Sequence, residues 1–252
     1  TFRNNPIGHP IDIVDIGGRR LLLDCGLIQG GAAPDERNRA PFPFDAAGID
    51  AVILSHPHID HCGRLPLLYT RGFRGAVYAT AACRDLARIL LMDSAAMQQR
   101  DADRENRRRT RDGRKGRAEA LYTADDAEAT LGLIRSVDYR RAFEVLPGVE
   151  LTFRDAGHIL GSASVWLRLR EGDLERRIVF SGDLGQYDSP ILRDPEPGPA
   201  ADLVVMESTY GDRLHRDRDA TLVEFGEILL HARQDGGNVL IPAFAVGRSQ
   251  DL

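Results

Sequence analysis

Three histidines and one aspartate fall within six positions of the stretch SHPHIDHCGRL, residues 55–65. This stretch directly follows DAVIL, an apolar run with the length of a buried strand. Side chains alternate along a strand, so His56 and His58 should point to the same side just beyond its end. Asp60 and His61 follow where the chain should turn into a helix, and they leave the loop at a different angle. We expect the first pair to share one metal ion and the second pair to reach another.

The residue types in this cluster are those that bind zinc. Imidazole nitrogens and carboxylate oxygens are common zinc ligands, and a catalytic zinc site keeps a position open for water. A single histidine would be explained by an ordinary core or surface position. No packing requirement explains four ligand-type residues in six positions, because histidine and aspartate are seldom needed in a core.

Three further ligand-type residues follow other predicted strands. His158 lies in FRDAGHILGSAS, beside glycines that allow close approach of the backbone. Asp183 ends the apolar run IVFSGD, where a carboxylate could bridge two ions. Asp24, in LLLDCG, is expected to accept the free N–H of a ligand histidine and so fix its tautomer. Each is a weak indication alone, because Asp and Gly are common turn residues.

The apolar pattern of the whole chain predicts a mixed α/β fold. Strands come in pairs and threes between helices, which favours two sheets covered by helices. The predicted strands are residues 11–16, 19–25, 50–55, 75–80, 149–157, 163–170, 176–183, 201–208 and 237–244. The predicted helices are residues 64–69, 81–100, 123–136 and 219–234.

Composition excludes several classes of protein. With 42% hydrophobic and 28% charged residues, the 252-residue chain is not generally disordered. Its three cysteines are too few for a disulfide framework and fit a reducing cytoplasm. It has no signal-peptide core and no apolar run of about 18 residues, so we expect a soluble cytoplasmic chain without a membrane span. The start at Thr1 and the ending GRSQDL, which reads as a helix just begun, suggest a piece of a longer protein.

Positive charge is concentrated in residues 100–117, RDADRENRRRTRDGRKGR. Nine Arg or Lys and four Asp or Glu give this segment a local charge of +5, which leaves −10 for the rest of a chain of net charge −5. Two interpretations remain open. The segment is either a solvated helix end with a flexible loop or a patch that binds a polyanion such as nucleic acid.

The ordered motifs LLLDCG, SHPHIDHCGRLP, DAGHILGSAS and SGDLG resemble those of the metallo-β-lactamase superfamily. MESTYGDRLH and GNVLIPAFAVGRSQDL resemble its β-CASP branch, which processes nucleic acids. Within that branch the chain is more similar to the cleavage-and-polyadenylation specificity factor nucleases than to ribonuclease J. The resemblance runs from about residue 17 to residue 252. It implies an α/β fold, an incomplete four-layer αββα sandwich over residues 1–212, and the start of a β-CASP cap domain over residues 213–252.

The resemblance also implies roles for individual residues. The first zinc would be held by His56, His58 and His158, the second by Asp60 and His61, and both by a bridging Asp183. Glu207 would be the acidic residue that pairs with a later histidine near the leaving group. His215 lies in a segment typical of the branch, and a plain surface position is an equal alternative. His231 is expected to be structural, because it falls near the end of a helix.

The activity implied is hydrolysis of RNA phosphodiester bonds at a dinuclear zinc site, with Asp60, Asp183 and Glu207 as catalytic residues. The expected partner is single-stranded RNA, and a homodimer is left open. In this family the last ligand of the second zinc comes from a later histidine, so we expect one tight zinc in this chain and low ribonuclease activity. A small-molecule (thio)ester or lactam hydrolase is an alternative, because the metal cluster alone does not separate an ester from a phosphodiester. A non-catalytic RNA-binding homologue is another.

Overall fold

The structure is a computed structural model that describes residues 2–4 and 11–251. The chain divides into two compact units, Thr1–Met206 and Glu207–Leu252, and each is described by itself. The domain boundary predicted after residue 212 lies slightly later in the chain. That the second unit begins a β-CASP domain stays a prediction.

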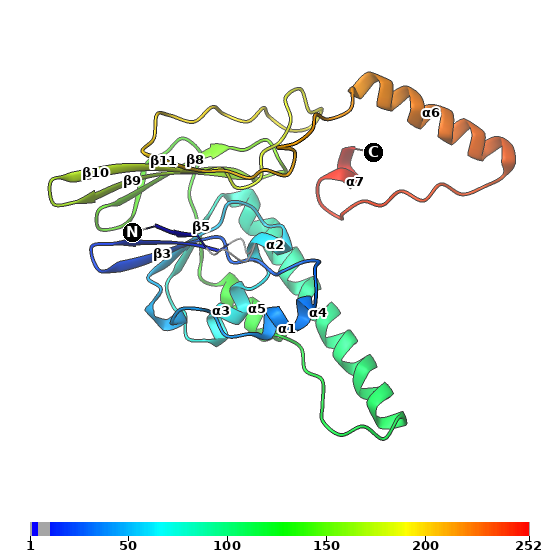
Figure 1. Cartoon of the computed structure of the whole chain (residues 1–252), viewed down its shortest axis with the longest axis horizontal. Helices are drawn as coiled ribbons and strands as arrows, with labels where there is room; N and C mark the ends of the chain where they lie inside the picture. The colour runs from blue at the N-terminus through cyan, green and yellow to red at the C-terminus, as the bar shows by residue number, and fades with distance from the viewer. Residues whose placement is uncertain (1, 5–10, 252) are drawn as a thin grey trace. The chain divides into compact units, whose positions relative to one another are not determined.

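The first sheet has six strands that follow one another in chain order (Figure 1). Its strands are β1 (Phe2–Asn4), β2 (Asp12–Ile16), β3 (Arg19–Leu23), β4 (Ala51–Ile53), β5 (Ala76–Ala79) and β6 (Ile134–Ser136). The first three pair antiparallel, and β3 to β6 pair parallel. Gly17 and Gly18 form the two-residue turn between β2 and β3, and both have the positive φ that such hairpin turns require.

The second sheet has five strands in the order β11-β10-β9-β8-β7. Its strands are β7 (Phe143–Leu146), β8 (Val149–Asp155), β9 (Ala163–Glu171), β10 (Leu174–Phe180) and β11 (Leu203–Val205). All neighbours pair antiparallel except β10 and β11, which are parallel. In Figure 1 the two sheets form separate layers of the first unit.

Helices cover the face of the first sheet that points away from the second (Figure 1). They are α1 (Pro34–Arg39), a 3-10 helix (Ala46–Gly48), α2 (Ile59–Cys62), α3 (Leu65–Thr70), α4 (Ala81–Arg111) and α5 (Ala124–Leu131). Thr80 caps α4 by accepting the N–H of Cys83 at 3.2 Å. Thr123 and Asp126 form a reciprocal capping box at the start of α5.

Alternation along β3 divides the apolar residues between two cores. Leu22 packs in the core between the first sheet and the helices, together with Cys25, Cys62 and Cys83. Leu21 and Leu23 point the other way, into the core between the two sheets, where the β8 side chain Phe153 is fully buried. The two packed sheets with their helical layer confirm the predicted α/β sandwich.

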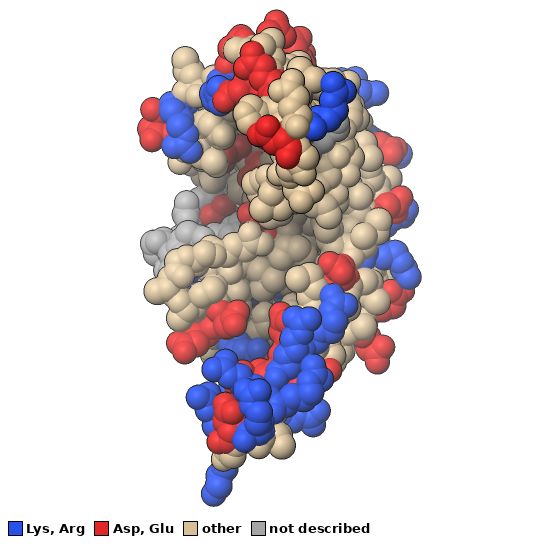
Figure 2. All heavy atoms as spheres, turned by 90° about the vertical axis from the view of Figure 1, so that its right-hand side faces the viewer, with Lys and Arg blue, Asp and Glu red and all other residues tan. Residues whose placement is uncertain are grey.

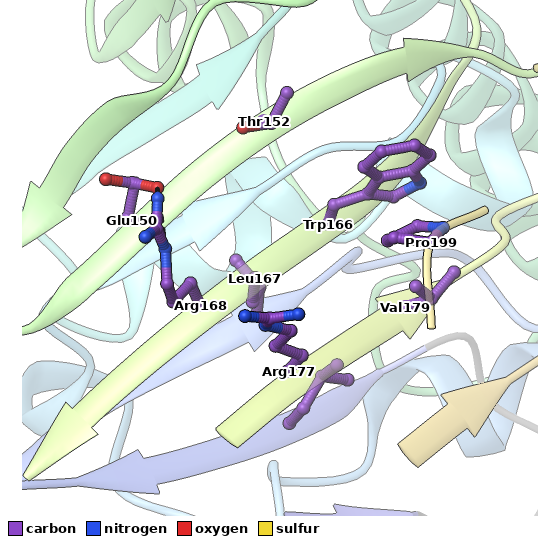
Figure 3. A pocket seen from close by; sticks show the side chains of 9 residues that line it. Glu150, Thr152, Trp166, Leu167, Arg168, Arg177, Val179 and Pro199 are labelled. Atoms are coloured by element: carbon purple, nitrogen blue, oxygen red, sulfur yellow. Dashed lines mark hydrogen bonds and ion pairs between the residues drawn. The ribbon is translucent and has the colours of Figure 1, made fainter. Parts of the chain in front are cut away.

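Cross-strand pairs organise the outer face of the second sheet, seen in Figure 3. Trp166 on β9 lies between Thr152 on β8 and Val179 on β10. Two residues further along β9, Arg168 lies opposite Arg177 on β10 and opposite Glu150 on β8. Its ion pair with Glu150 offsets the repulsion between the two arginines. Together with Pro199 these side chains border a shallow hollow of about 310 Å³.

The second unit contains α6 (Arg218–Asp235) and α7 (Arg248–Asp251). None of the described residues of α6 is buried. The strand predicted over residues 237–244 was wrong, since that segment has no regular structure. A strand is stable only when a neighbouring strand satisfies its backbone hydrogen bonds, and the described part of this unit contains none.

Two predicted helices have different limits in the structure. The helix predicted to end at Arg100 runs on to Arg111, through polar residues with good helix propensity and pairs such as Glu105 with Arg109. The helix predicted over residues 123–136 ends at Leu131. Residues 134–136, which the prediction placed in the same helix, instead form β6, which pairs with β5. Among the described helices, none has both the length and the apolar character needed to cross a membrane.

The core between the sheets should contribute strongly to stability. Replacing Phe153, which is fully buried, in Phe153→Ala should lower the free energy of unfolding by about 3–5 kcal/mol, because the substitution leaves a cavity. The matched control is Phe143→Ala, since Phe143 is 39% exposed on β7 and should cost about 1 kcal/mol or less. Denaturant unfolding followed by circular dichroism measures both. Equal losses in the two variants would contradict this placement of the core.

Candidate metal centre

The predicted ligands lie at the ends of strands that belong to both sheets. His56 and His58 follow β4 of the first sheet, and His58 is the residue that precedes α2. His158 follows β8, and Asp183 follows β10, both of the second sheet. Residues more than a hundred positions apart in the sequence therefore meet where the two sheets end.

Four of these side chains converge closely enough to hold one metal ion. One ligand atom from each of His56, His58, His158 and Asp183 lies within 4.8 Å of all the others. Nδ1 of His58 is 3.1 Å from Nε2 of His56 and 3.1 Å from Nε2 of His158. Oδ2 of Asp183 is 3.7 Å from Nε2 of His56 and 3.6 Å from Nε2 of His158. The group that the sequence assigned to the first ion is brought together.

Of the remaining predicted ligands, His61 faces the other carboxylate oxygen of Asp183, and Asp60 lies beside His61. Nε2 of His61 is 3.2 Å from Oδ1 of Asp183 and 4.0 Å from Oδ2 of Asp60. The two oxygens of Asp183 thus face different groups of histidines. This arrangement is the one expected of a carboxylate that bridges two ions.

Asp24 forms the buried support of this arrangement. Its carboxylate accepts hydrogen bonds from the backbone N–H of Ser55, from the Ser55 hydroxyl and from Nδ1 of His61, each at 2.7 Å. The predicted contact between Asp24 and a histidine is therefore present. With Nδ1 occupied by this bond, the Nε2 atom of His61 is the one that faces Asp183.

Ser55 is a residue of this site that the sequence analysis missed. Its hydroxyl lies 3.0 Å from Nδ1 of His56 as well as 2.7 Å from Asp24, so it links the two side chains. It orients the ring whose Nε2 faces the other ligands. The available signal was its position directly before the first histidine of the cluster.

Glycines allow the loops of the two sheets to lie against each other. Gly182, at φ +55°, packs on Ser55, and an added Cβ would come within 2.8 Å of the serine Cβ. Gly185 packs on the loop of His158, where an added Cβ would lie 1.7 Å from the Gly157 carbonyl oxygen. Asp183 lies between these two close approaches, which fix the position of its loop.

Burial and neighbouring charges set the protonation of the site. Full burial, together with the surrounding histidines, lowers the pKa of His56 well below its usual value, so this ring is neutral near pH 7. Burial alone would also lower the pKa of His61, but its hydrogen bonds to Asp183 and Asp24 raise it to about 10. Burial opposes ionisation of Asp183, yet the hydrogen bond from His61 lowers the pKa of this carboxyl overall. His56 and Asp183 are therefore in the forms that bind a metal ion, a neutral imidazole and an ionised carboxylate, whereas His61 would lose a proton when an ion binds.

The other predicted site residues belong to the second unit. Glu207 is its first residue, and its catalytic role stays a prediction. His215 stacks on Tyr210 with ring centroids 3.6 Å apart. His231 is exposed and lies 2.9 Å from Asp235 within α6, and its structural role stays a prediction.

Comparison with known proteins identifies the family. The family model for a beta-lactamase superfamily domain matches residues 19–242. The chain is 43% identical over 236 residues to Ribonuclease TTHA0252 of Thermus thermophilus, covering 94% of this chain and 49% of that protein. It is 34% identical over 240 residues to Transcription termination factor FttA of Methanothermobacter thermautotrophicus, covering 92% of this chain and 35% of that protein.

A third relative is Cleavage and polyadenylation specificity factor 73 of Drosophila melanogaster, 29% identical over 248 residues, which cover 98% of this chain and 31% of that protein. The chain therefore spans about half the length, or less, of the curated relatives it matches. The matched family model covers most of the chain and includes the histidine cluster. The chain belongs to the metallo-β-lactamase superfamily, among relatives that are β-CASP RNA-processing nucleases.

Proposed function

We propose that this chain provides the metal centre of a zinc-dependent ribonuclease that hydrolyses phosphodiester bonds in single-stranded RNA. The observation that carries the proposal is the convergence of three histidines and one aspartate from loops of both sheets. The names of two relatives, a ribonuclease and a cleavage factor, support RNA as the substrate. A cytoplasmic location and a homodimer stay predictions.

The spacing of the ligand atoms supports zinc. Zinc binds histidine nitrogen at about 2.0–2.1 Å in tetrahedral sites, which places neighbouring ligand atoms about 3.3 Å apart. Four of the six separations among these side chains are 3.1, 3.1, 3.6 and 3.7 Å, and the ligand atoms all lie within 4.8 Å of one another. A donor set of imidazole and carboxylate is also one that zinc accepts. His56, His58, His158 and Asp183 would hold the first ion.

Asp60 and His61 would hold a second ion together with Asp183. This set has three protein ligands, and the side chain of Asp60 is 46% exposed. Fewer ligands and greater exposure favour weaker binding. We expect about one tightly bound zinc per chain after dialysis, with the second ion weak or absent. Two equally tight ions would contradict this division of the ligands.

The chain's own residues would position the reactants. When bound, the metal supplies Lewis acidity that activates water as the nucleophile and polarises a phosphoryl oxygen. Asp60, exposed at the edge of the group, can accept a hydrogen bond from that water and orient it. Asp24 keeps His61 in the required tautomer, and Ser55 does the same for His56. Glu207 would act beside the leaving oxygen through a histidine outside this chain, as the resemblance implies.

An RNA cleavage assay tests the proposed reaction. The chain and the full-length gene product are each incubated with labelled single-stranded RNA, a thioester and a β-lactam. We expect metal-dependent cleavage of RNA by the full-length product, weak cleavage by the chain, and no turnover of the other two substrates. Hydrolysis of the thioester or the β-lactam without RNA cleavage would replace this proposal with a small-molecule hydrolase. An absence of all turnover in the metal-loaded full-length product would favour a non-catalytic RNA-binding homologue.

The first ion should depend on His58. His58→Ala should remove the tightly bound zinc and abolish hydrolysis while leaving the melting temperature of the metal-free protein nearly unchanged, because the ligand lies on a loop. The matched control is His231→Ala, an exposed histidine on α6, which should keep both zinc and activity. Metal analysis beside thermal melting measures these effects. A folded His58→Ala protein with unchanged zinc would remove this residue from the site.

Asp24 should tune metal affinity without contacting the metal. Asp24→Asn tolerates the backbone, which has φ 58°, but replaces one accepting oxygen with an NH₂ group that faces donors. We expect the affinity of the ion that His61 would hold to fall about 10–100-fold, because Asp24 orients that ring. Competition with a coloured chelator measures the affinity, and Asp15→Asn, on β2, is the control that should leave zinc affinity unchanged. An unchanged affinity in the folded Asp24→Asn protein would contradict the support role.

A further inference from the structure

The far end of α4 and the loop after it form a structured basic arm, defined here as residues 100–122. Its first eighteen residues carry nine Arg or Lys and four Asp or Glu. Figure 2 shows the positive side chains gathered at the lower end of the molecule, and Figure 1 places the end of α4 there. The two interpretations left open by the sequence can therefore be tested against its contacts.

Hydrogen bonds hold the loop of the basic arm against the helix. The side chain of Asn106 donates to the carbonyl of Ala118 at 2.9 Å and accepts the N–H of the same residue at 2.7 Å. Leu121 donates its N–H to Oε1 of Gln98 at 3.0 Å, and Arg39, the last residue of α1, donates to the carbonyl of Glu119 at 2.6 Å. These bonds fix the loop against the helix, which argues against the flexible-loop interpretation. The basic arm is an ordered surface.

The helix and the returning loop form an open hollow of about 550 Å³, and half of its eight lining residues are cations. Four of its lining residues are Arg107, Arg109, Arg114 and Arg117. Its one acidic lining residue, Asp103, already accepts a hydrogen bond from Gln99 at 3.0 Å. The hollow is far larger than a single small anion requires, so its size suits a chain of anionic groups.

Ion pairs divide the cations of the basic arm into two sets. Arg104, Arg108, Arg109 and Arg111 each lie within 4.0 Å of a carboxylate of the same segment. Among the described residues, no carboxylate forms an ion pair with the other five cations, which are Arg100, Arg107, Arg114, Lys115 and Arg117. Three of these five line the hollow. The hollow therefore presents positive charge that the protein itself does not neutralise.

We propose that this hollow binds the phosphate backbone of an RNA strand at a distance from the metal centre. Guanidinium groups form paired hydrogen bonds with phosphate oxygens, and neutralising the phosphates releases counterions from the polyanion, which favours binding. The inference rests on the proposed action on RNA, which favours a nucleic acid over an acidic protein. It adds a second contact surface for the same substrate.

The length of α4 sets how far this contact lies from the cleavage site. The helix begins next to the loop of His158, where the Thr80 hydroxyl donates to the Gly161 carbonyl at 2.7 Å. Arg107 comes 26 residues after Ala81, which is about 39 Å along the helix axis. At about 3.4 Å per stacked nucleotide this distance corresponds to about 12 nucleotides. Stacked RNA would need about this length to reach both surfaces, whereas an extended strand would need fewer nucleotides.

Two triple variants on the same arm test the proposal with equal changes of charge. One variant replaces the unpaired cations of the hollow, Arg107→Gln, Arg114→Gln and Arg117→Gln. The control replaces paired cations outside the hollow's lining, Arg104→Gln, Arg108→Gln and Arg111→Gln. Both leave Asn106 and its bonds to Ala118 in place, and circular dichroism checks that both fold.

Binding is measured by fluorescence anisotropy on the His58→Ala background, so that cleavage does not interfere and the result stands whether or not the protein cuts RNA. For a single strand of about 30 nucleotides, the hollow variant should bind roughly tenfold or more weakly, and its slope of log Kd against log salt should fall by about 2. The control variant should change both values much less. For a strand of about 6 nucleotides at the metal centre of the cleaving protein, kcat/KM should be the same in both variants.

Equal losses in the two variants would overturn the proposal, because general surface charge would then explain the binding. Competition with polyglutamate separates RNA from an acidic protein. We expect polyglutamate at equal charge concentration to displace the RNA poorly. Displacement as effective as that by unlabelled RNA would overturn RNA as the partner of the hollow.

Discussion

The packing of the two sheets against each other is the constraint on which the rest of the structure depends. The side chains between them, such as Phe153 and Leu21, are fully buried and fix the separation of the layers. The ligand loops leave from both layers: His56 and His58 from the first, His158 and Asp183 from the second. A backbone hydrogen bond from Ala163 to Ser55, 2.9 Å long, joins the layers beside these loops. The distance between ligands is thus set by apolar packing as much as by the loops, and a change in the core would reach the metal centre.

A buried carboxylate, that of Asp24, then fixes the orientation of side chains at the metal centre. Asp24 has no exposed surface, and an unpaired charge there would be strongly destabilising. Three hydrogen bonds from Ser55 and His61 compensate the buried charge. His61 is itself a predicted ligand, and Ser55 precedes the predicted ligand His56. Folding of β3 and β4 therefore orients His61 before any ion binds. The same bonds stabilise the fold and prepare the site, so the two effects are coupled through one side chain.

Much of the fold and of the site could be predicted from the sequence, and the exceptions share a cause. Alternating apolar runs gave most strands, and the spacing of His56, His58 and His61 at a strand end indicated the metal centre before any contact was known. Three features depend on partners that local sequence does not specify. β6 forms because β5 offers an edge, residues 237–244 form no strand because the described part of their unit offers none, and Ser55 acts through an aspartate 31 positions away. The extension of α4 beyond Arg100 is held by polar contacts, which an apolar pattern does not reveal.

The three buried thiols have a practical consequence. Cys25 and Cys62 adjoin Asp24 and His61, Cys83 lies near the start of α4, and all three are inaccessible to solvent. An alkylating reagent reacts with an exposed thiolate, so it can modify these residues only during transient opening of the helix-covered core. Because the three thiols lie in one core, their rates of modification would report how often that core opens. The protein's own three thiols can therefore report this opening, and no label needs to be engineered.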